Sequence, residues 1–253
     1  MYTIDMNCDL AESFGAYHIG MDEEILPYIT SANLACGFHA SDPAVMKKSV
    51  EACRCKQVAV GAHPGFPDIQ GFGRRNMVLA PEEIKAMIMY QIGALDAFCR
   101  ANGIAMQHVK PHGALYNMAG KDLAMARAIC EAIAAVNPHL LLMAQAGSQM
   151  EKAAKELDLQ MAREVFADRA YEEDGSLVPR SKPGSMIEDE EQAVSRVIMM
   201  VRQGKVKAIT GKEIPIQADS VCVHGDGEKA LLFVKKLREA FAAEGIQVQA
   251  LVR

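Results

Sequence analysis

The chain has 253 residues, of which 50% are hydrophobic and 23% charged, and its formal net charge at pH 7 is −5. This size and composition are typical of a folded protein as large as one α/β barrel, and they exclude a disordered chain. The acidic balance and the absence of tryptophan disfavour a nucleic-acid-binding protein.

Short apolar or alternating runs recur along the chain, and each is followed by a turn cluster and then by a segment with helical period. The predicted strands are, in chain order, 3–9, 29–36, 58–63, 105–110, 140–146, 161–166 and 220–224, with a further short one at 248–252. The predicted helices are 43–57, 81–102, 123–136, 149–157, 190–203 and 228–243, and Asp42 and Pro43 provide capping signals for the first. This alternation predicts an α/β barrel, and because no linker interrupts it, we expect one domain over residues 1–253.

Two predicted connections, 64–79 and 167–187, are longer than is usual in a compact domain. Loops of this length are commonly functional, although an ordinary surface excursion is the alternative. The second connection contains an acidic stretch at 172–174 and two glycines, Gly175 and Gly184, that could act as hinges. We therefore expect it to be a lid or a partner-docking loop at the mouth of the barrel.

The N-terminal residues 1–7 have neither the basic nor the apolar region of a secretory signal. No apolar run approaches the roughly 18 residues that span a bilayer. We therefore expect a soluble, cytoplasmic protein. The seven cysteines are scattered through predicted strands and helices, which favours reduced thiols over a disulfide framework.

Ionisable residues stand where a barrel normally carries Val, Ile or Leu. The first predicted strand places Asp5, Asn7 and Asp9 on one face, and His63, Lys110 and His224 stand at the ends of three later strands. Since active sites of β/α barrels lie at the carboxyl ends of the strands, we expect these side chains to meet there. A single histidine would more often be an ordinary hydrogen-bonded residue than a catalyst, so the prediction depends on their combination.

Several motifs stand at these strand ends and in the long loops. They are NCDLAESFG at 7–15, SANLACGFH at 31–39, GAHPGFPD at 61–68, VKPHGALYN at 109–117, EVFADRAY at 164–171, LVPR at 177–180 and VHGD at 223–226. Taken together, and in this order over residues 6–227, they resemble the LamB/YcsF family. The resemblance implies an incomplete, seven-stranded, TIM-like (β/α) barrel related to the glycoside hydrolase/deacetylase superfamily.

The resemblance also implies an activity, the ATP-dependent opening of 5-oxo-L-proline to L-glutamate, with ATP hydrolysed to ADP and phosphate. Two companion subunits, B and C, are implied as partners. No G-x-x-x-x-G-K-[ST] motif occurs in the sequence, so ATP as co-substrate could be bound mainly by those partners. The helix that follows His224 could hold an anion at its N-terminus, although an ordinary glycine-rich turn is the alternative.

Opening an activated lactam needs a general base for water, cations for the substrate carboxylate and the phosphate, and donors for the oxyanion. We predict that Asp9 and His63 form the acid/base pair and that Lys110 stabilises charge. The predicted substrate-binding residues are Asn7, Glu12, Asn33, His39, Arg74, Arg75, His112, Asp168, Arg169, Arg180 and His224.

Simpler roles remain open for some of these residues. Asp9 could be a buried hydrogen-bonding residue, the Arg74–Arg75 pair a solvated loop tip, and Asp168–Arg169 a loop ion pair. Histidine and aspartate at neighbouring strand ends could also ligate zinc or another divalent metal. Two other functions therefore stay open, a stand-alone metal-dependent amide hydrolase or deacetylase and a non-catalytic barrel that binds a small molecule.

Overall fold

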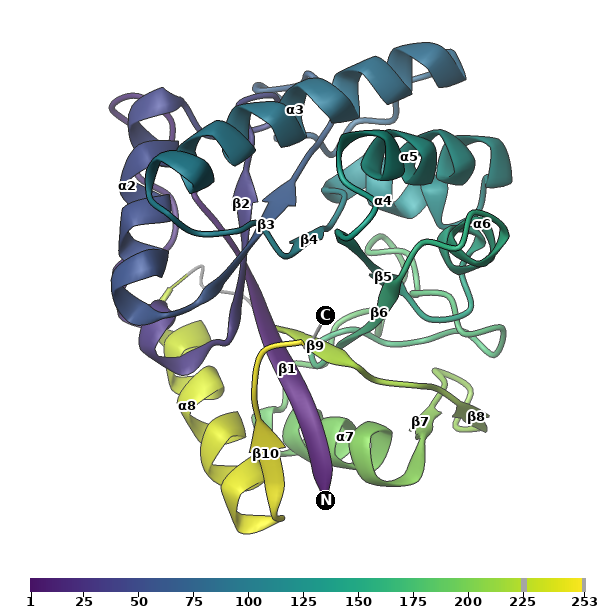
Figure 1. The fold of residues 1–253 in the computed structure, drawn as a ribbon. Coiled ribbons are helices and arrows are strands. Elements are labelled where there is room, and N and C mark those ends of the chain that lie inside the picture. The colour runs from purple at the N-terminus through teal and green to yellow at the C-terminus, as the bar shows by residue number, and fades with distance from the viewer. Residues whose placement is uncertain (224–226, 252–253) are drawn as a thin grey trace.

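The computed structural model describes residues 1–223 and 227–251. Parallel strands close into a seven-stranded barrel in the order β1 (Tyr2–Leu10), β2 (Ser31–Ala35), β3 (Ala59–His63), β4 (His108–Val109), β5 (Leu141–Gln145), β6 (Met161–Phe166) and β9 (Ser220–Val223). Strand β9 returns to pair with β1, which closes the ring (Figure 1). The predicted seven-stranded β/α barrel is confirmed.

Helices surround the strands (Figure 1). They are α2 (Pro43–Lys56), α3 (Pro81–Ala101), α5 (Leu123–Val136), α6 (Gln149–Glu156), α7 (Glu190–Gln203) and α8 (Glu228–Ala243), and each confirms a predicted helix to within one residue at either end. Asp42 caps α2 as expected, because its side chain accepts the N–H groups of Ala44 and Val45.

Several short elements were not predicted. They are α1 (Asp22–Ile25), η1 (Leu26–Tyr28), α4 (Gly113–Ala119) and a hairpin of β7 (Lys205–Lys207) with β8 (Glu213–Pro215). Each is too short to show a hydrophobic period.

The short strand predicted at 248–252 was wrong in position. Strand β10 is Ile246–Val248, and it pairs with Tyr2–Ile4 of β1. Strand β9 pairs with the residues of β1 that follow, Asp5–Cys8. The chain then leaves the sheet, and the side chain of Gln107 donates to the carbonyl of Leu251 at 2.8 Å. Leu251 therefore lies at the amino end of the barrel rather than in a strand, and Val252 lies outside the described residues.

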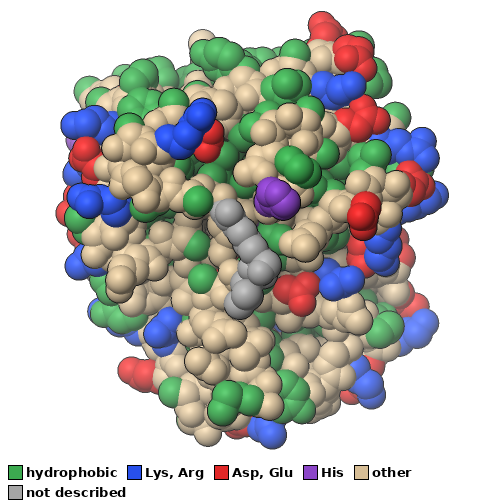
Figure 2. All heavy atoms as spheres, viewed as in Figure 1, with side chains coloured by type: hydrophobic (Ala, Val, Ile, Leu, Met, Phe, Trp, Pro, Cys, Tyr) green, Lys and Arg blue, Asp and Glu red, His purple; other side chains and the backbone are tan. Residues whose placement is uncertain are grey.

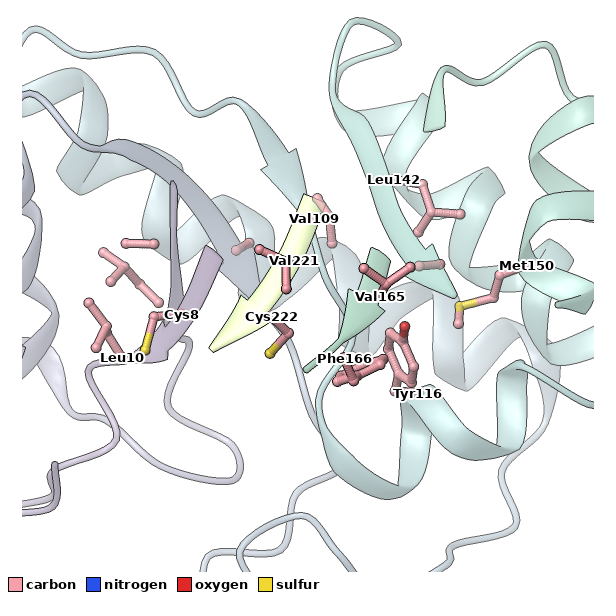
Figure 3. Packing of buried hydrophobic residues seen from close by; sticks show 14 of the residues in the cluster. Cys8, Leu10, Val109, Tyr116, Leu142, Met150, Val165, Phe166, Val221 and Cys222 are labelled. Carbon is pink, nitrogen blue, oxygen red and sulfur yellow. The ribbon is translucent and has the colours of Figure 1, made fainter. Parts of the chain in front are cut away.

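The hydrophobic core lies between the strands and the helices. Ile4, Met6 and Cys8 of β1 are fully buried in it, and Figure 3 shows further members from later strands, including Val165 and Val221. The strand residues that alternate with these core residues point into the barrel, and many of the inward residues are polar. Gly61 permits this packing, because a Cβ atom there would lie 2.1 Å from Nε2 of His108.

The long connection 167–187 is partly tied to the barrel. Tyr171 is fully buried, and its hydroxyl accepts the N–H of Phe166 at 2.9 Å. Bridges between Arg169 and Met186 and between Tyr171 and Leu177 fold the connection back on itself. The expectation of a lid or docking loop therefore stays a prediction for the outer part only, beyond Tyr171.

Figure 2 shows basic and acidic side chains interspersed on the face that it draws. Within the described residues, which include all seven cysteines, the structure has no disulfide bond, and Cys55 is the exposed cysteine. Within residues 1–223 and 227–251, none of the helices has the length and apolar character needed to cross a membrane.

Candidate active site

The barrel interior holds a connected set of buried polar side chains. Its members are Asp5, Asn7 and Asp9 of β1, Ser31 and Asn33 of β2, His63 of β3, His108 of β4, Lys110 just after β4, Glu164 of β6 and Ser220 of β9. Strand alternation brings them together, because every second residue of each strand faces the barrel axis. Buried polar groups are costly unless they are hydrogen-bonded, and these side chains satisfy one another.

Asp5 is the member of this set nearest the amino end of β1. Its carboxylate accepts hydrogen bonds from Ser31 Oγ at 2.6 Å, from Thr30 Oγ1 at 2.7 Å and from Ser220 Oγ. Burial raises the pKa of Asp5, and the three hydroxyl donors oppose that shift. The hydrogen-bond partners of this carboxylate are hydroxyl groups, so we expect Asp5 to have a structural role.

Lys110 occupies the centre of the set, between two carboxylates. Its Nζ lies 2.9 Å from Oδ1 of Asp9 and 2.6 Å from Oε1 of Glu164. The other oxygen of Glu164 accepts the hydroxyl of Tyr116 at 2.8 Å, and Figure 3 shows Tyr116 beside Phe166. Burial would lower the pKa of Lys110, but the two carboxylates and the neighbouring Cys222 raise it well above its ordinary value. These contacts favour the charged form of Lys110.

Asp9 links Lys110 to the mouth of the barrel. Its Oδ1 accepts hydrogen bonds from Lys110 and from Asn33 Nδ2, the latter at 2.8 Å, while Oδ2 lies 3.3 Å from Nε2 of His63. Burial opposes ionisation, but His63 and Lys110 hold the pKa of Asp9 well below its usual range. Its side chain keeps 21% exposure, so an ionised carboxylate faces the opening.

Three histidines and a glutamate form the next layer outward. The rings of His39 and His112 are stacked, with centroids 3.7 Å apart and planes 3° from parallel. Glu12 Oε1 lies 3.5 Å from Nε2 of His39 and 3.5 Å from Nδ1 of His112. One ligand atom from each of Glu12, His39, His63 and His112 can be chosen so that all four lie within 4.8 Å of one another. This buried cluster, called here the mouth cluster, could hold a metal ion.

Backbone carbonyls fix the tautomers of two of these histidines. Nδ1 of His63 lies 2.7 Å from the carbonyl oxygen of Lys110, and Nε2 of His112 lies 2.8 Å from that of Phe72. A carbonyl only accepts, so both of these nitrogens must carry the hydrogen. The remaining nitrogens, Nε2 of His63 and Nδ1 of His112, then face each other at 2.9 Å with lone pairs when both rings are neutral. Such lone pairs repel, and a proton or a cation at this point would remove the repulsion.

Residues 4–253 match the LamB/YcsF family. The chain belongs to this family. The A subunit of 5-oxoprolinase from Clostridium beijerinckii is 64% identical over 248 residues, which cover 98% of this chain and 97% of that protein. The corresponding A subunit from Bacillus subtilis is 54% identical over 251 residues, with coverages of 99% and 98%.

Solved structures agree with this assignment. The lactam utilization protein from Thermus thermophilus superimposes with a TM-score of 0.94 at 46% identity, covering 98% of this chain and 100% of that one. A putative cellobiose-phosphate cleavage protein from Enterococcus faecalis V583 reaches a TM-score of 0.57 at 14% identity, with coverages of 98% and 96%. The second likeness shows a shared fold and nothing more.

The LamB/YcsF barrel brings most of the predicted site residues together. Those in mutual contact are Asn7, Asp9, Glu12, Asn33, His39, His63, Lys110 and His112. Their contacts lie at the carboxyl end of the strands, as the sequence predicts. Their individual roles stay predictions.

The predicted arginines lie apart from those contacts. Arg74 sits at the rim, with its guanidinium 5.1 Å from the ring centre of Phe72. Arg75 is paired with Asp68. In the connection 167–187, Arg169 donates to the carbonyl of Val178 at 2.8 Å. The predictions for Asp168 and Arg180, in the same connection, stay open, and the one for His224 lies outside the described residues.

Two residues near Lys110 were not predicted. Glu164 contacts Lys110 directly, and Tyr116 donates a hydrogen bond to Glu164. Glu164 lies within one of the motifs, but it directly follows another charged residue, Arg163, and was not predicted to be part of the site. Its alternation with the core residue Val165 was the available signal, because an inward carboxylate in a buried strand needs a cationic partner. Tyr116 lies on α4, which is too short to be predicted.

Acid should destabilise the metal-free LamB/YcsF barrel. Burial lowers the pKa of His112 to about 3, and burial also holds that of His39 well below its ordinary value. The folded state therefore binds fewer protons than the unfolded state as the pH falls through about 6.5, so the free energy of unfolding should fall between pH 7 and pH 5. Urea unfolding with a chelator present measures this. The decrease should be smaller for His112→Asn, and a flat profile for the unsubstituted chain would contradict the assignment.

Proposed function

We propose that this chain is the A subunit of an ATP-dependent 5-oxoprolinase that hydrolyses the lactam of 5-oxo-L-proline to L-glutamate, coupled to hydrolysis of ATP to ADP and phosphate, in the cytoplasm. The names of its relatives and of the Thermus protein support the proposal. One observation of this chain carries it furthest: the buried ammonium of Lys110 lies beside the ionised Asp9 where the strands end. A cation next to an ionised base at a barrel mouth suits attack of water on a carbonyl group.

The chemistry assigns a role to each group. An unactivated amide is a poor electrophile, so ATP would activate the lactam by phosphorylation of the amide oxygen. Asp9 and His63 would then take the proton of the attacking water and deliver one to the ring nitrogen as the C–N bond breaks, which leaves an acyl phosphate that a second water hydrolyses to glutamate and phosphate. Lys110 would stabilise the negative charge that develops on oxygen, since it is held as a cation in a site with little water.

ATP would be bound mainly by companion subunits. The sequence has no phosphate-binding loop motif, and relatives named as one lettered subunit of an enzyme imply a complex of several proteins. We propose two companions, B and C, that supply the nucleotide and the phosphoryl transfer. The connection 167–187, with Asp168, Arg169 and Arg180, would face the substrate or a companion.

A divalent metal ion belongs to the same proposal. The mouth cluster would hold it through Glu12 Oε1, His63 Nε2, His112 Nδ1 and one ring nitrogen of His39, and with Nε2 of His63 bound to the ion the acid/base role would pass to Asp9 alone. The facing lone pairs of His63 and His112 fit this, and so do the ring nitrogens of His39, which have no hydrogen-bond partner among the described residues. The carbonyls of Lys110 and Phe72 are the outer partners that commonly orient histidine ligands. Such an ion would lower the pKa of a nearby water and polarise a carbonyl.

Metal content tests this part of the proposal. Protein purified without chelator and dialysed against metal-free buffer should retain about one divalent ion per chain, measured by elemental analysis. Glu12→Gln and His112→Asn should retain much less. His139→Ala, which removes an exposed histidine elsewhere, is the control and should retain as much as the unsubstituted chain. Unchanged content in the first two variants would exclude the mouth cluster as the site.

The purified chain alone distinguishes the proposal from its alternatives. We expect it to release no glutamate from 5-oxo-L-proline without companions and ATP. A stand-alone metal-dependent hydrolase or deacetylase would instead turn over acetylated sugars or small amides by itself. A non-catalytic binding barrel would bind 5-oxo-L-proline and show no turnover even when the companions and ATP are added.

A further inference from the structure

The direction of the Glu12 side chain does not follow from strand β1. Along β1, Asp5, Asn7 and Asp9 face the barrel interior, so a continued strand would point residue 11 inward and residue 12 outward. The carboxylate of Glu12 nevertheless lies among the histidines of the mouth cluster. The chain must therefore break the alternation between Asp9 and Glu12.

Ala11 makes this break. Its φ is +60°, in the left-handed region that residues other than glycine, asparagine and aspartate seldom adopt, and it is completely buried. An alanine does not hold such a conformation through its own preference, so a contact must stabilise it. The N–H of Ala11 donates to Oδ2 of Asp22 at 2.8 Å, and Asp22 is the first residue of α1.

We propose that Asp22 is a positioning residue that locks the left-handed turn at Ala11 and thereby presents Glu12 to the histidines of the mouth cluster. Without this acceptor, Ala11 relaxes toward an extended conformation, and the side chain of Glu12 turns away from His39 and His112. The inference rests on the metal site proposed above and not on the lactam reaction, so metal binding by the isolated chain tests it.

A second aspartate provides a matched control. Asp42 Oδ2 accepts the N–H of Gly15 at 2.8 Å, so Asp42 holds the same loop on the far side of Glu12, and it also caps α2. Removing its carboxylate should lower thermal stability, because a helix loses its cap. It should leave the turn at Ala11, and with it the metal affinity, close to that of the unsubstituted chain.

The experiment measures Zn²⁺ affinity by competition with a chromophoric chelator and ligand number from the visible spectrum of bound Co²⁺. Asp22→Ala should weaken Zn²⁺ binding by roughly 10- to 100-fold, the effect usual for an outer partner of a metal ligand, and should change the Co²⁺ spectrum as Glu12→Gln does. Asp22→Asn retains an acceptor oxygen and should bind almost normally. Adding Ala11→Gly to Asp22→Ala should restore most of the affinity, because glycine adopts a positive φ without strain.

These outcomes decide the proposal. If Asp22→Ala loses thermal stability but keeps the Zn²⁺ affinity and Co²⁺ spectrum of the unsubstituted chain, Asp22 is only structural and the proposal is wrong. It is also wrong if the losses from Asp22→Ala and Glu12→Gln add in the double variant, because a residue that acts only through Glu12 has no effect once Glu12 is replaced. If the unsubstituted chain binds no metal, crystal structures decide: the carboxylate of Glu12 must leave the histidines in Asp22→Ala, and an unchanged Ala11 turn overturns the proposal.

Discussion

Replacing Lys110 by methionine should abolish glutamate formation by the reconstituted complex and should also destabilise the barrel. Methionine has a similar length but no charge, so Asp9 and Glu164 would face each other without their shared cation. Removing one member of a buried ion pair typically costs about 3–5 kcal/mol of stability. Loss of a group that stabilises charge in the transition state typically lowers turnover by about 10²–10³. Glutamate release and urea unfolding measure the two effects.

The double variant Lys110→Met, Glu164→Gln separates them. Glutamine at position 164 removes one of the two carboxylate charges that lose their cation. It can still accept a hydrogen bond from the hydroxyl of Tyr116. We expect much of the lost stability to return while glutamate formation stays absent. Turnover near that of the unsubstituted chain in the stabilised double variant would show that Lys110 is a structural cation only.

Asp9→Asn should reduce turnover steeply while leaving the fold largely in place. Asparagine keeps an oxygen for Lys110 and Asn33, but it removes the negative charge that faces His63. Loss of a general base typically lowers the rate by about 10²–10⁴. The destabilisation should be smaller than for Lys110→Met, because Lys110 keeps its ion pair with Glu164. Glutamate release at matched assembly of the complex is the measurement.

Asp5→Asn is the matched control for that variant. Asp5 is an equally inward aspartate of the same strand, but its partners are the hydroxyls of Thr30, Ser31 and Ser220. It should change stability and leave turnover close to that of the unsubstituted chain. If Asp5→Asn and Asp9→Asn instead lower stability alike and both keep turnover, Asp9 is a buried hydrogen-bonding residue and not a base.

Periodicity was enough to predict the barrel and the end of it at which the polar residues of the candidate site gather. Alternation in β1 separates Asp5, Asn7 and Asp9 from the core face, and each surrounding helix is long enough to show its period. The positions of His63 and Lys110 follow from the same rule, because each ends or directly follows a predicted strand. The sequence therefore predicted which strands carry residues of the candidate site and that the polar residues of these strands point inward.

Contacts made across the barrel could not be predicted in this way. Periodicity places Lys110 inward, but only the closed ring shows that Glu164, on a strand far away in the sequence, shares it with Asp9. Glu12 violates alternation through the left-handed turn at Ala11, and alanine at that position gives no signal of a positive φ. The facing nitrogens of His63 and His112 depend on two backbone carbonyls, which the sequence does not place.

The central claim, that this chain opens the lactam only as part of an ATP-dependent complex, is tested most directly by reconstitution. The chain would be combined with the two proposed companion subunits, and glutamate released from 5-oxo-L-proline would be measured with and without ATP and with each protein omitted in turn. We predict glutamate only when ATP and all three proteins are present. Glutamate formed without ATP, or by this chain alone, would contradict the claim.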